Sequence, residues 1–170
     1  MRADVRDAEF TAYVAAQRPR LVRAARLLTA GDQLAAEDLV QTTLTRLYVR
    51  WPRVSGADDP IAYGYRSLTN TFLDERQRAH HRREVVTERQ PEHPAPGSDL
   101  DVRALVLDAL TELAPRQRAV VVLRHFLEYD VSGAARVLGC SEGTVKSQNA
   151  KALARLREIL GDQLLNEGMS

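Results

Sequence analysis

Apolar residues recur along most of the chain at intervals of three and four positions, which is the period of an amphipathic helix. The apolar positions that show this spacing near the start are Phe10, Val14, Leu21, Ala25 and Leu28. The strict apolar–polar alternation of a β-strand is missing from the sequence. The pattern therefore predicts helices over 10–28, over about 34–51, and from Pro60 through Arg78 or slightly beyond, with a turn-rich stretch over 52–60 between the last two. In the third helix we expect Ile61, Leu68 and Phe72 to lie in the core.

The helical period stops between residues 84 and 101. This stretch holds Pro91, Pro94 and Pro96, several acids and few apolar residues, which predicts a flexible linker. Beyond it the period returns and predicts helices over 102–113, 115–127, 131–138 and 142–160, with a frayed tail over 161–170. The expected fold class is all-α: a helical domain over 1–83 and a second over 102–170, joined by the linker over 84–101.

Composition places the chain among folded proteins. Of its 170 residues, 44% are hydrophobic and 28% are charged, a balance typical of globular domains. Apolar runs such as 119–123 are too short to span a bilayer, and residues 1–10 mix Arg with Asp where a secretory signal would be apolar. We therefore expect a cytoplasmic protein with no membrane insertion.

Cys140 is the single cysteine, which excludes a disulfide within the chain.

The formal net charge is only +1. A surface for nucleic acid would therefore have to come from local clustering of basic residues. The basic residues are almost all arginine, which suits phosphate contacts.

The segment from Val131 to Leu160 has the pattern of a helix-turn-helix. Ala135 is small enough for a second helix to cross the first closely, and Gly139 can take the left-handed conformation that ends a helix. Ser141 can cap the next helix through its hydroxyl group, and Glu142 suits the positive first turn of that helix.

The second helix of this motif has two distinct faces. One carries Val145, Ala152, Leu156 and Ile159, and the other carries Gly143, Ser147, Ala150 and Ala154 between the cations Lys146, Lys151 and Arg157. Small side chains let a helix approach base edges in the major groove, and the cations meet phosphates. The alternative interpretation is an ordinary bundle helix with a solvated basic side.

Three segments carry a resemblance to a known family. L-x-x-L-A-P-R-Q-R-A-V-V-V-L-R (Leu110–Arg124) and A-R-V-L-G-C-S-E-G-T-V-K-S (135–147) resemble region four of the extracytoplasmic-function (ECF) sigma factors of the sigma-70 family. A-E-D-L-V-Q-T-T-L-T-R-L-Y (Ala36–Tyr48) resembles their region two. The details are similar to the short actinobacterial subgroup, and the likeness covers nearly all of the chain outside the linker.

The resemblance implies how the two halves divide their work. The first half would bind the clamp helices of the largest subunit of RNA polymerase core enzyme and open the minus-ten element of promoter DNA. The second would bind the minus-thirty-five element and contact the polymerase flap. Whether an anti-sigma factor also binds stays open at the level of sequence.

The candidate site residues fall into three groups. The polar face opposite Val40, Leu44, Leu47 and Trp51 is the candidate polymerase surface and holds Asp38, Gln41, Thr42 and Thr45. Candidate contacts to the minus-ten element are Tyr63, Arg66, Asn70, Arg76, Arg78, Arg82 and Arg83. Candidate contacts to the minus-thirty-five element are Ser141, Gly143, Thr144, Lys146, Ser147 and Lys151. Each group has an alternative interpretation as a solvated helix surface, and Glu37 could instead form a local ion pair.

An enzyme is not expected, because the sequence has no P-loop, dinucleotide-binding glycine pattern or nucleophile motif. No cofactor is expected, and no metal site, because the adjacent His80 and His81 cannot face one ion from a regular helix. The main alternative function is a one-component helix-turn-helix regulator that works without polymerase. A protein-interaction module whose arginines bind acidic partners is the third.

Two residues raise packing questions. Gly64 lies within a predicted helix, where glycine costs roughly 1 kcal/mol relative to alanine, so we expect close packing or a bend there. Asn149 leans toward the apolar face of its helix and needs a hydrogen-bond partner if it is buried.

Overall fold

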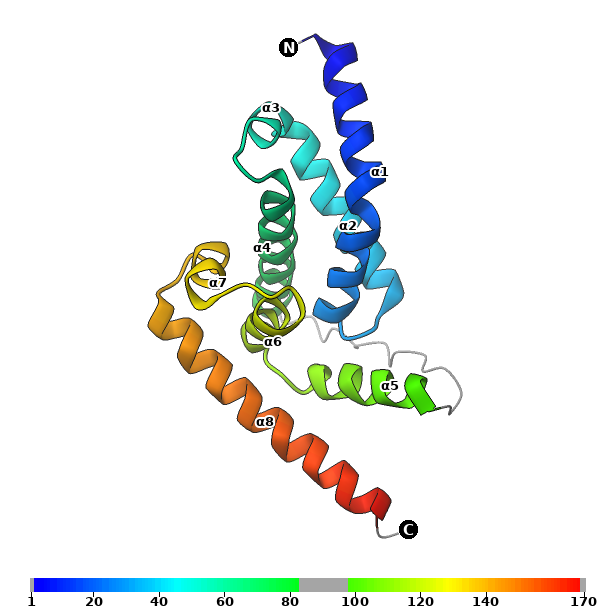
Figure 1. Ribbon diagram of the computed structural model, residues 1–170, viewed down its shortest axis with the longest axis vertical. Helices are drawn as coiled ribbons and strands as arrows, with labels where there is room; N and C mark the ends of the chain where they lie inside the picture. The colour runs from blue at the N-terminus through cyan, green and yellow to red at the C-terminus, as the bar shows by residue number, and fades with distance from the viewer. Residues whose placement is uncertain (1, 83–97, 169–170) are drawn as a thin grey trace.

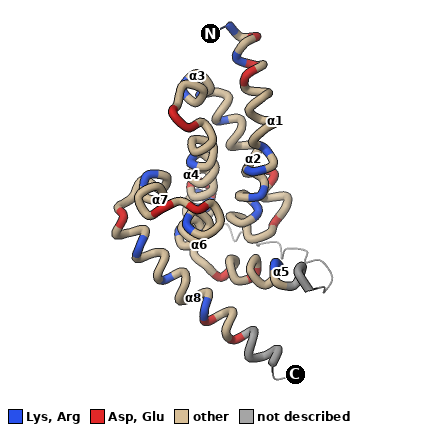
Figure 2. Tube along the Cα trace, in the orientation of Figure 1, with Lys and Arg blue, Asp and Glu red and all other residues tan. Residues whose placement is uncertain are grey.

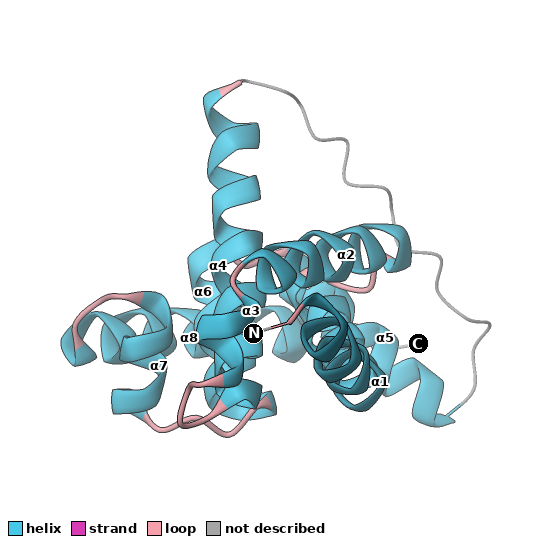
Figure 3. Ribbon diagram, turned by 90° about the horizontal axis from the view of Figure 1, so that it is seen from above, coloured by secondary structure: helices cyan, strands magenta, loops and turns pink. Residues whose placement is uncertain are grey.

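A computed structural model describes residues 2–82 and 98–168 of the protein, and these residues form helices and connecting loops without strands (Figures 1 and 3). The helices are α1 (Ala3–Leu28), α2 (Gln33–Val49), α3 (Trp51–Ser55), α4 (Pro60–His81), α5 (Ser98–Thr111), α6 (Pro115–Val121), the π-helical turn η1 (Val122–Phe126), α7 (Val131–Leu138) and α8 (Glu142–Gly168). The all-α fold class is confirmed.

Several helix ends lie where the capping residues predict them. The Asp59 carboxylate accepts hydrogen bonds from the backbone N–H groups of Ile61 and Ala62, and Pro60 occupies the first turn of α4. Helix α7 has the predicted bounds, and Gly139 ends it at φ 65° in the left-handed region. Local side-chain chemistry therefore sets these boundaries.

Other boundaries differ from the prediction. Helix α1 begins at Ala3, seven residues before the first apolar position of its pattern, and α3 occupies the start of the stretch expected to be a turn. Helix α5 begins at Ser98, so residues 98–101 are helical, while residues 83–97, which hold the rest of the predicted linker, lie outside the described residues. The frayed tail is wrong for 161–168, because α8 continues as a helix to Gly168.

Helices α1, α2 and α4 form the core of the first half. Leu21, Leu28, Val40, Leu47 and Leu68 are among its buried side chains. An aromatic cluster joins the start of α1 to α3, with the Phe10 and Tyr13 rings 5.2 and 5.1 Å from the Trp51 ring. Ile61, expected in the core, is 39% exposed because it lies in the first turn of α4, at the edge of the bundle.

Gly64 marks a close approach between α1 and α4. A Cβ atom at residue 64 would overlap the hydroxyl oxygen of Tyr13, while the ring carbon Cζ below it would lie 3.6 Å away. The Tyr13 hydroxyl group donates a hydrogen bond to the Pro60 carbonyl oxygen at 3.2 Å. Close packing, one of the two expected reasons for this glycine, is therefore confirmed.

The same contact gives stability a dependence on alkaline pH. Burial, with smaller effects from Tyr65 and Asp59, raises the pKa of Tyr13 to about 12. A phenol whose pKa is higher in the folded than in the unfolded state stabilises the fold below the unfolded value near 10, and that contribution is lost as pH rises to about 12. We expect the free energy of unfolding of the Tyr13→Phe variant to fall less between pH 10 and 12, measured by urea denaturation. An equal fall in both proteins would exclude Tyr13 as the cause.

The two halves pack against each other. Helix α4 contacts α6 and α7, and α1 contacts α6 and η1. One buried cluster contains Leu21, Ala24 and Leu28 from the first half with Ala119 and Leu123 from the second. Figure 1 shows α7 beside α4, and α8 running from there along the lower edge of the molecule. We call this contact between residues 2–82 and 98–168 the seam.

Two unusual residues lie at the seam. The Arg118 side chain is 2% exposed, and Nη1 donates to the carbonyl oxygen of Leu28 at 3.0 Å. Ala30, between α1 and α2, is 3% exposed and has φ 53°. A left-handed conformation costs roughly 1–2 kcal/mol for a residue other than glycine. The Ala30 methyl group packs with Leu110 and Leu113 of the second half, which offsets part of that cost.

Candidate nucleic-acid and protein interfaces

Helix α2 presents the predicted polar face to solvent. Asp38, Gln41 and Thr45 are exposed and Thr42 is half-buried, while the opposite face carries the buried Val40, Leu44 and Leu47 of the core. Because these residues recur every three or four positions, the core contacts of α2 fix which side chains point outward. The structure therefore brings the four candidates together on one open surface.

Two apolar residues extend this surface. Leu34 is 62% exposed and Val49 is 70% exposed, and both lie on the stripe of α2 that contains Asp38, Gln41 and Thr45. Exposed apolar residues beside polar ones are typical of surfaces that bind other proteins. Neither residue was among the candidates from the sequence, although their helical spacing from Asp38 and Thr45 places them on that stripe. Glu37 pairs with Arg18 of α1 at 3.2 Å, so its expected ion pair is present, although the partner lies on another helix and not nearby in the sequence.

A polar cleft of about 850 Å³ separates the end of α2 and α3 from α4. Three of the candidate minus-ten residues, Tyr63, Arg66 and Asn70, line it from α4. Arg46 lines it from α2 and is held by the Thr71 hydroxyl group at 3.1 Å and by Asp74 at 3.5 Å. The cleft combines an aromatic ring, an amide and guanidinium groups, which suits a nucleotide base with its phosphate.

The other wall of this cleft carries cations that were not among the candidates from the sequence. Arg46, Arg50 and Arg53 line it from α2 and α3. Their spacing of four and three residues would have placed them on one helix face, but α3 was expected to be a turn. Of the remaining candidates, Arg76 and Arg78 lie further along α4 and Arg82 lies just after its last residue; Arg78 and Arg82 are exposed and Arg76 is half-buried. Arg83 lies outside the described residues.

Partial desolvation raises the pKa of the Glu75 carboxyl group, and Arg46 and Arg78 oppose this rise while Asp38 adds to it. Glu75 on α4 therefore lies within electrostatic reach of the candidate polymerase face on α2.

The turn between α7 and α8 has the geometry expected from its sequence. The Asp130 carboxylate caps α7 by accepting from Gly133 N–H at 2.6 Å. The Ser141 hydroxyl group accepts from Thr144 N–H at 3.1 Å, and the Ser141 and Thr144 hydroxyl groups lie 2.9 Å apart. These contacts fix the first turn of α8, in which Ser141 and Thr144 use their hydroxyl groups for structure.

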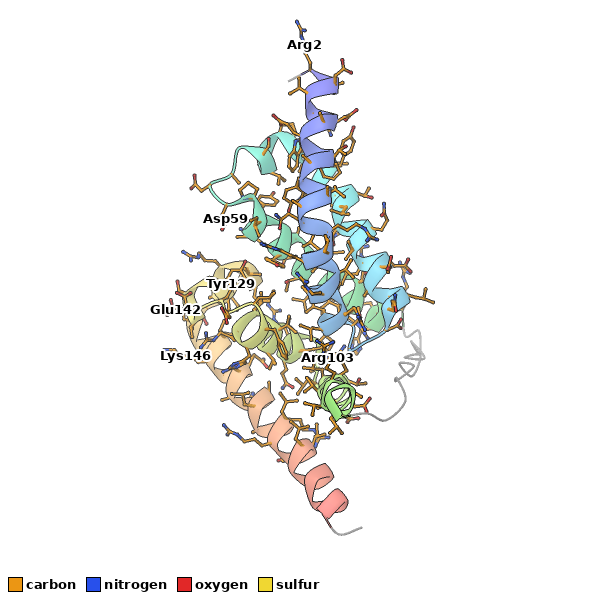
Figure 4. The ribbon with its side chains drawn as sticks, turned by 45° about the vertical axis from the view of Figure 1, so that its right-hand side comes forward. Arg2, Asp59, Arg103, Tyr129, Glu142 and Lys146 are labelled. Atoms are coloured by element: carbon orange, nitrogen blue, oxygen red, sulfur yellow. The ribbon has the colours of Figure 1, made fainter. Side chains whose placement is uncertain are left out.

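Helix α8 buries one face and exposes the other as predicted. Val145 and Ala152 are fully buried. The candidate residues are all exposed: Ser141, Gly143, Thr144, Lys146, Ser147 and Lys151. Figure 4 shows Glu142 and Lys146 at the outer edge of the molecule, on the side away from α1, and Figure 2 shows cations recurring along α8. Asn149 has the partner it needs, because its Oδ1 lies 2.9 Å from His125 Nε2.

A smaller cleft of about 360 Å³ adjoins this exposed face. Arg124 from η1 and Lys146, Asn149 and Arg157 from α8 line it. Arg124 was not a candidate, because its distance from Lys146 in the sequence gives no sign of their proximity. Arg124 also donates to the Tyr129 carbonyl oxygen at 2.6 Å and so braces the loop before α7.

Comparisons with known proteins agree with this geometry. The family model of sigma-70 region 2 matches residues 13–83, and that of sigma-70 region 4 matches residues 103–156. The RNA polymerase sigma-E factor of Streptomyces coelicolor is 45% identical over 155 residues, which cover 89% of this chain and 86% of that protein. The ECF RNA polymerase sigma factor SigL of Mycobacterium tuberculosis is 37% identical over 138 residues, covering 76% of this chain and 77% of SigL.

The chain belongs to the ECF sigma factors. The interpretation as an RNA polymerase sigma factor is thereby confirmed over that of a one-component regulator. A solved sigma factor, RpoE of Bartonella quintana in complex with the anti-sigma factor NepR, matches the fold with a TM-score of 0.74 and 29% identity. That match covers 90% of this chain and 97% of RpoE.

Among residues 2–82 and 98–168 of this sigma factor, no helix has both the length and the apolar content needed to cross a bilayer.

Proposed function

We propose that the two halves of this sigma factor bind separate targets: α2 and α4 engage core polymerase and the minus-ten element, and α8 binds the minus-thirty-five element. One observation supports this division above the others. The α2 face, the cleft beside α4 and the face of α8 are all solvent-exposed and lie on different helices. Such a protein acts in the cytoplasm with the polymerase and contributes no catalytic step or cofactor of its own.

The polymerase surface consists of Asp38, Gln41, Thr42 and Thr45, bordered by Leu34 and Val49. The exposed apolar ends supply area to bury, and the polar centre supplies the contacts that set the orientation of the partner. Leu34 and Val49 are each more than half exposed. A helix face that contacts only water gains no stability from large apolar side chains there, whereas a face that binds a protein does.

The minus-ten element binds in and beside the cleft of α4. An unstacked base enters between Tyr63 and Asn70, and the arginines on both walls contact the phosphates of the displaced strand. Arg78, Arg82 and Arg83 continue the basic path beyond the cleft. The polar lining supports this proposal, because a cleft for an apolar ligand would not contain four arginines.

The minus-thirty-five element binds to the exposed face of α8. We expect Lys146→Ala to weaken binding of full-length protein to duplex DNA and to lower the slope of log affinity against log salt by about one unit, because one phosphate contact is lost. Fluorescence anisotropy at several salt concentrations measures the slope. Arg103→Ala, an exposed cation on α5, is the control and should leave the slope unchanged. An unaltered slope in Lys146→Ala would exclude the phosphate role.

An anti-sigma factor is a further proposed partner. A groove of about 420 Å³ crosses the seam and is lined by Arg20 and Arg23 of α1 and, from the second half, by Glu128 and by Phe126, which is 43% exposed. An apolar residue beside paired cations suits an amphipathic helix with acidic residues. The likeness to RpoE, which was solved with an anti-sigma factor, adds support.

The experiment that tests the proposed function is transcription in vitro. Purified core polymerase of Streptomyces coelicolor is combined with this protein on genomic DNA fragments, and the start sites are mapped. Start sites that depend on the protein support the proposal. Binding to DNA without initiation would favour a regulator that acts alone, and binding to neither DNA nor polymerase would favour a protein-interaction module.

A further inference from the structure

The cleft beside α4 carries more positive charge than a single nucleotide of a DNA strand neutralises. Four arginines and one aspartate line it, which leaves a net charge of +3 on the lining side chains. Arg46 is already held by two side chains of α4. Arg50, Arg53 and Arg66 are exposed, and in the part of the chain that the structure describes their guanidinium groups make no hydrogen bond or ion pair. These three cations are therefore available to an anionic ligand.

The wall that carries Arg50 and Arg53 is anchored to the core of the first half. Trp51 and Val54 of α3 are buried, and the Trp51 ring lies 5.2 Å from the Phe10 ring. Because these buried side chains fix the backbone of α3, the two arginines next to them line the cleft without a rearrangement of the chain. A site that is already formed binds a small ligand without the free-energy cost of ordering the site.

The opposite wall offers groups that suit a nucleobase. Tyr63, Arg66 and Asn70 follow one another at helical spacing, so they lie along one face of α4. The Tyr63 ring provides a stacking surface, and the Asn70 amide both donates and accepts hydrogen bonds at a base edge. The volume of about 850 Å³ is within the range of small-molecule sites. The cleft therefore combines a place for one base with positive charge for several phosphate groups.

A nucleotide within a strand brings one phosphate charge with its base, whereas a free nucleoside triphosphate brings its whole triphosphate chain. We infer that the cleft is also a binding site for a free nucleoside triphosphate, with the base against Tyr63 and Asn70 and the triphosphate chain along the three available arginines. The nucleotide binds and dissociates unchanged. Its regulatory consequence rests on the proposed function: because the minus-ten strand uses the same cleft, the bound nucleotide competes with that strand.

Isothermal titration calorimetry of the full chain with ATP tests the site. A magnesium-free buffer of low ionic strength leaves the phosphate charges unneutralised and weakly screened. We expect one ATP to bind per chain, and AMP to bind at least about tenfold more weakly because it has fewer phosphate groups for the exposed arginines. Inorganic triphosphate, which has no base, should also bind more weakly than ATP. Absence of saturable ATP binding, or equal affinity for ATP and either comparison ligand, would overturn the inference.

Variants of the arginines locate the bound nucleotide. Arg53→Ala and Arg66→Ala should each lower the affinity for ATP by up to about fivefold, because each removes one exposed ion pair with a phosphate group. Both side chains are exposed, so circular dichroism should show an unchanged helical fold. Arg26→Ala removes the same charge from an exposed position on α1 and is the matched control. If Arg26→Ala weakens ATP binding as much as Arg53→Ala does, the binding reflects overall charge and the proposed site is wrong.

Displacement of DNA tests the competition. A labelled single-stranded oligodeoxynucleotide is bound to the protein, and its fluorescence anisotropy is followed as ATP is added; we expect ATP to release it. An oligonucleotide that stays bound at saturating ATP would overturn the shared site. Calorimetry requires neither DNA nor polymerase, so the two proposals fail differently. ATP binding without oligonucleotide binding would support the nucleotide site and count against the minus-ten role of the cleft, whereas oligonucleotide binding without ATP binding would overturn only the nucleotide site.

Discussion

Substitution of Asp38 by Arg together with Gln41 by Ala is expected to abolish binding to core polymerase, with an affinity at least 100-fold lower, because the centre of the α2 face loses its carboxylate and amide and gains a repulsive charge. A loss of this size is within the range of hot-spot substitutions at protein interfaces. Both side chains are exposed, so the fold should be unaffected. Fluorescence anisotropy of labelled sigma factor against core polymerase measures the affinity.

The matched control is Glu9→Arg with Gln33→Ala. It makes the same changes of charge and size at exposed positions outside the α2 stripe, and it should bind as the wild type does. Unchanged affinity of the Asp38–Gln41 double variant would refute the assignment of the polymerase surface. It would leave the membership in the ECF sigma factors intact, because that rests on the whole chain.

Substitution of Gly64 by Ala is expected to lower the free energy of unfolding by about 2 kcal/mol. Alanine favours a helix over glycine by about 1 kcal/mol, but the added methyl group would overlap the Tyr13 hydroxyl oxygen. Forcing an atom into a packed contact costs typically 1–3 kcal/mol, and the displaced hydroxyl group also loses its bond to Pro60. Urea denaturation followed by circular dichroism measures the change.

A double-mutant cycle separates the clash from other causes. Tyr13→Phe removes the overlapping oxygen and leaves the ring carbon at an ordinary contact distance, so Gly64→Ala should cost far less in that background. Gly161→Ala, also within a helix but with no atom near its added Cβ, should be neutral or stabilising. If Gly64→Ala destabilises equally with and without the Tyr13 hydroxyl group, the close approach is not the cause.

The sequence predicted the local features of the candidate sites well, because short-range chemistry determines them. Asp59, Gly139 and Ser141 mark helix ends whose capping bonds need no distant partner. The buried and exposed faces of α2 and α8 follow from residue spacing alone. The one core residue placed wrongly, Ile61, lies in a first turn, where periodicity does not reveal that the bundle ends.

The missed site residues share a different cause. Arg50 and Arg53 reach the cleft of α4 only because α3 folds as a helix. Arg124 lines the same cleft as Lys146 only because η1 lies near α8, where His125 and Asn149 share a hydrogen bond. Arg46 lies within Ala36–Tyr48, the segment that resembles region two, but it was not among the candidate site residues. A basic residue has no preferred partner in sequence, so its neighbours depend on how the helices cross.

The all-α class, the helix-turn-helix and the exposed face of α2 were predictable from the residues, since apolar period and capping act over a few positions. Two features emerge only from the folded chain: the halves join at one core, and Arg118, one of several arginines in its motif, is buried between them. These features were not predictable because Arg118 and the Leu28 carbonyl group are 90 residues apart, and no local pattern records which distant carbonyl group a guanidinium group will satisfy.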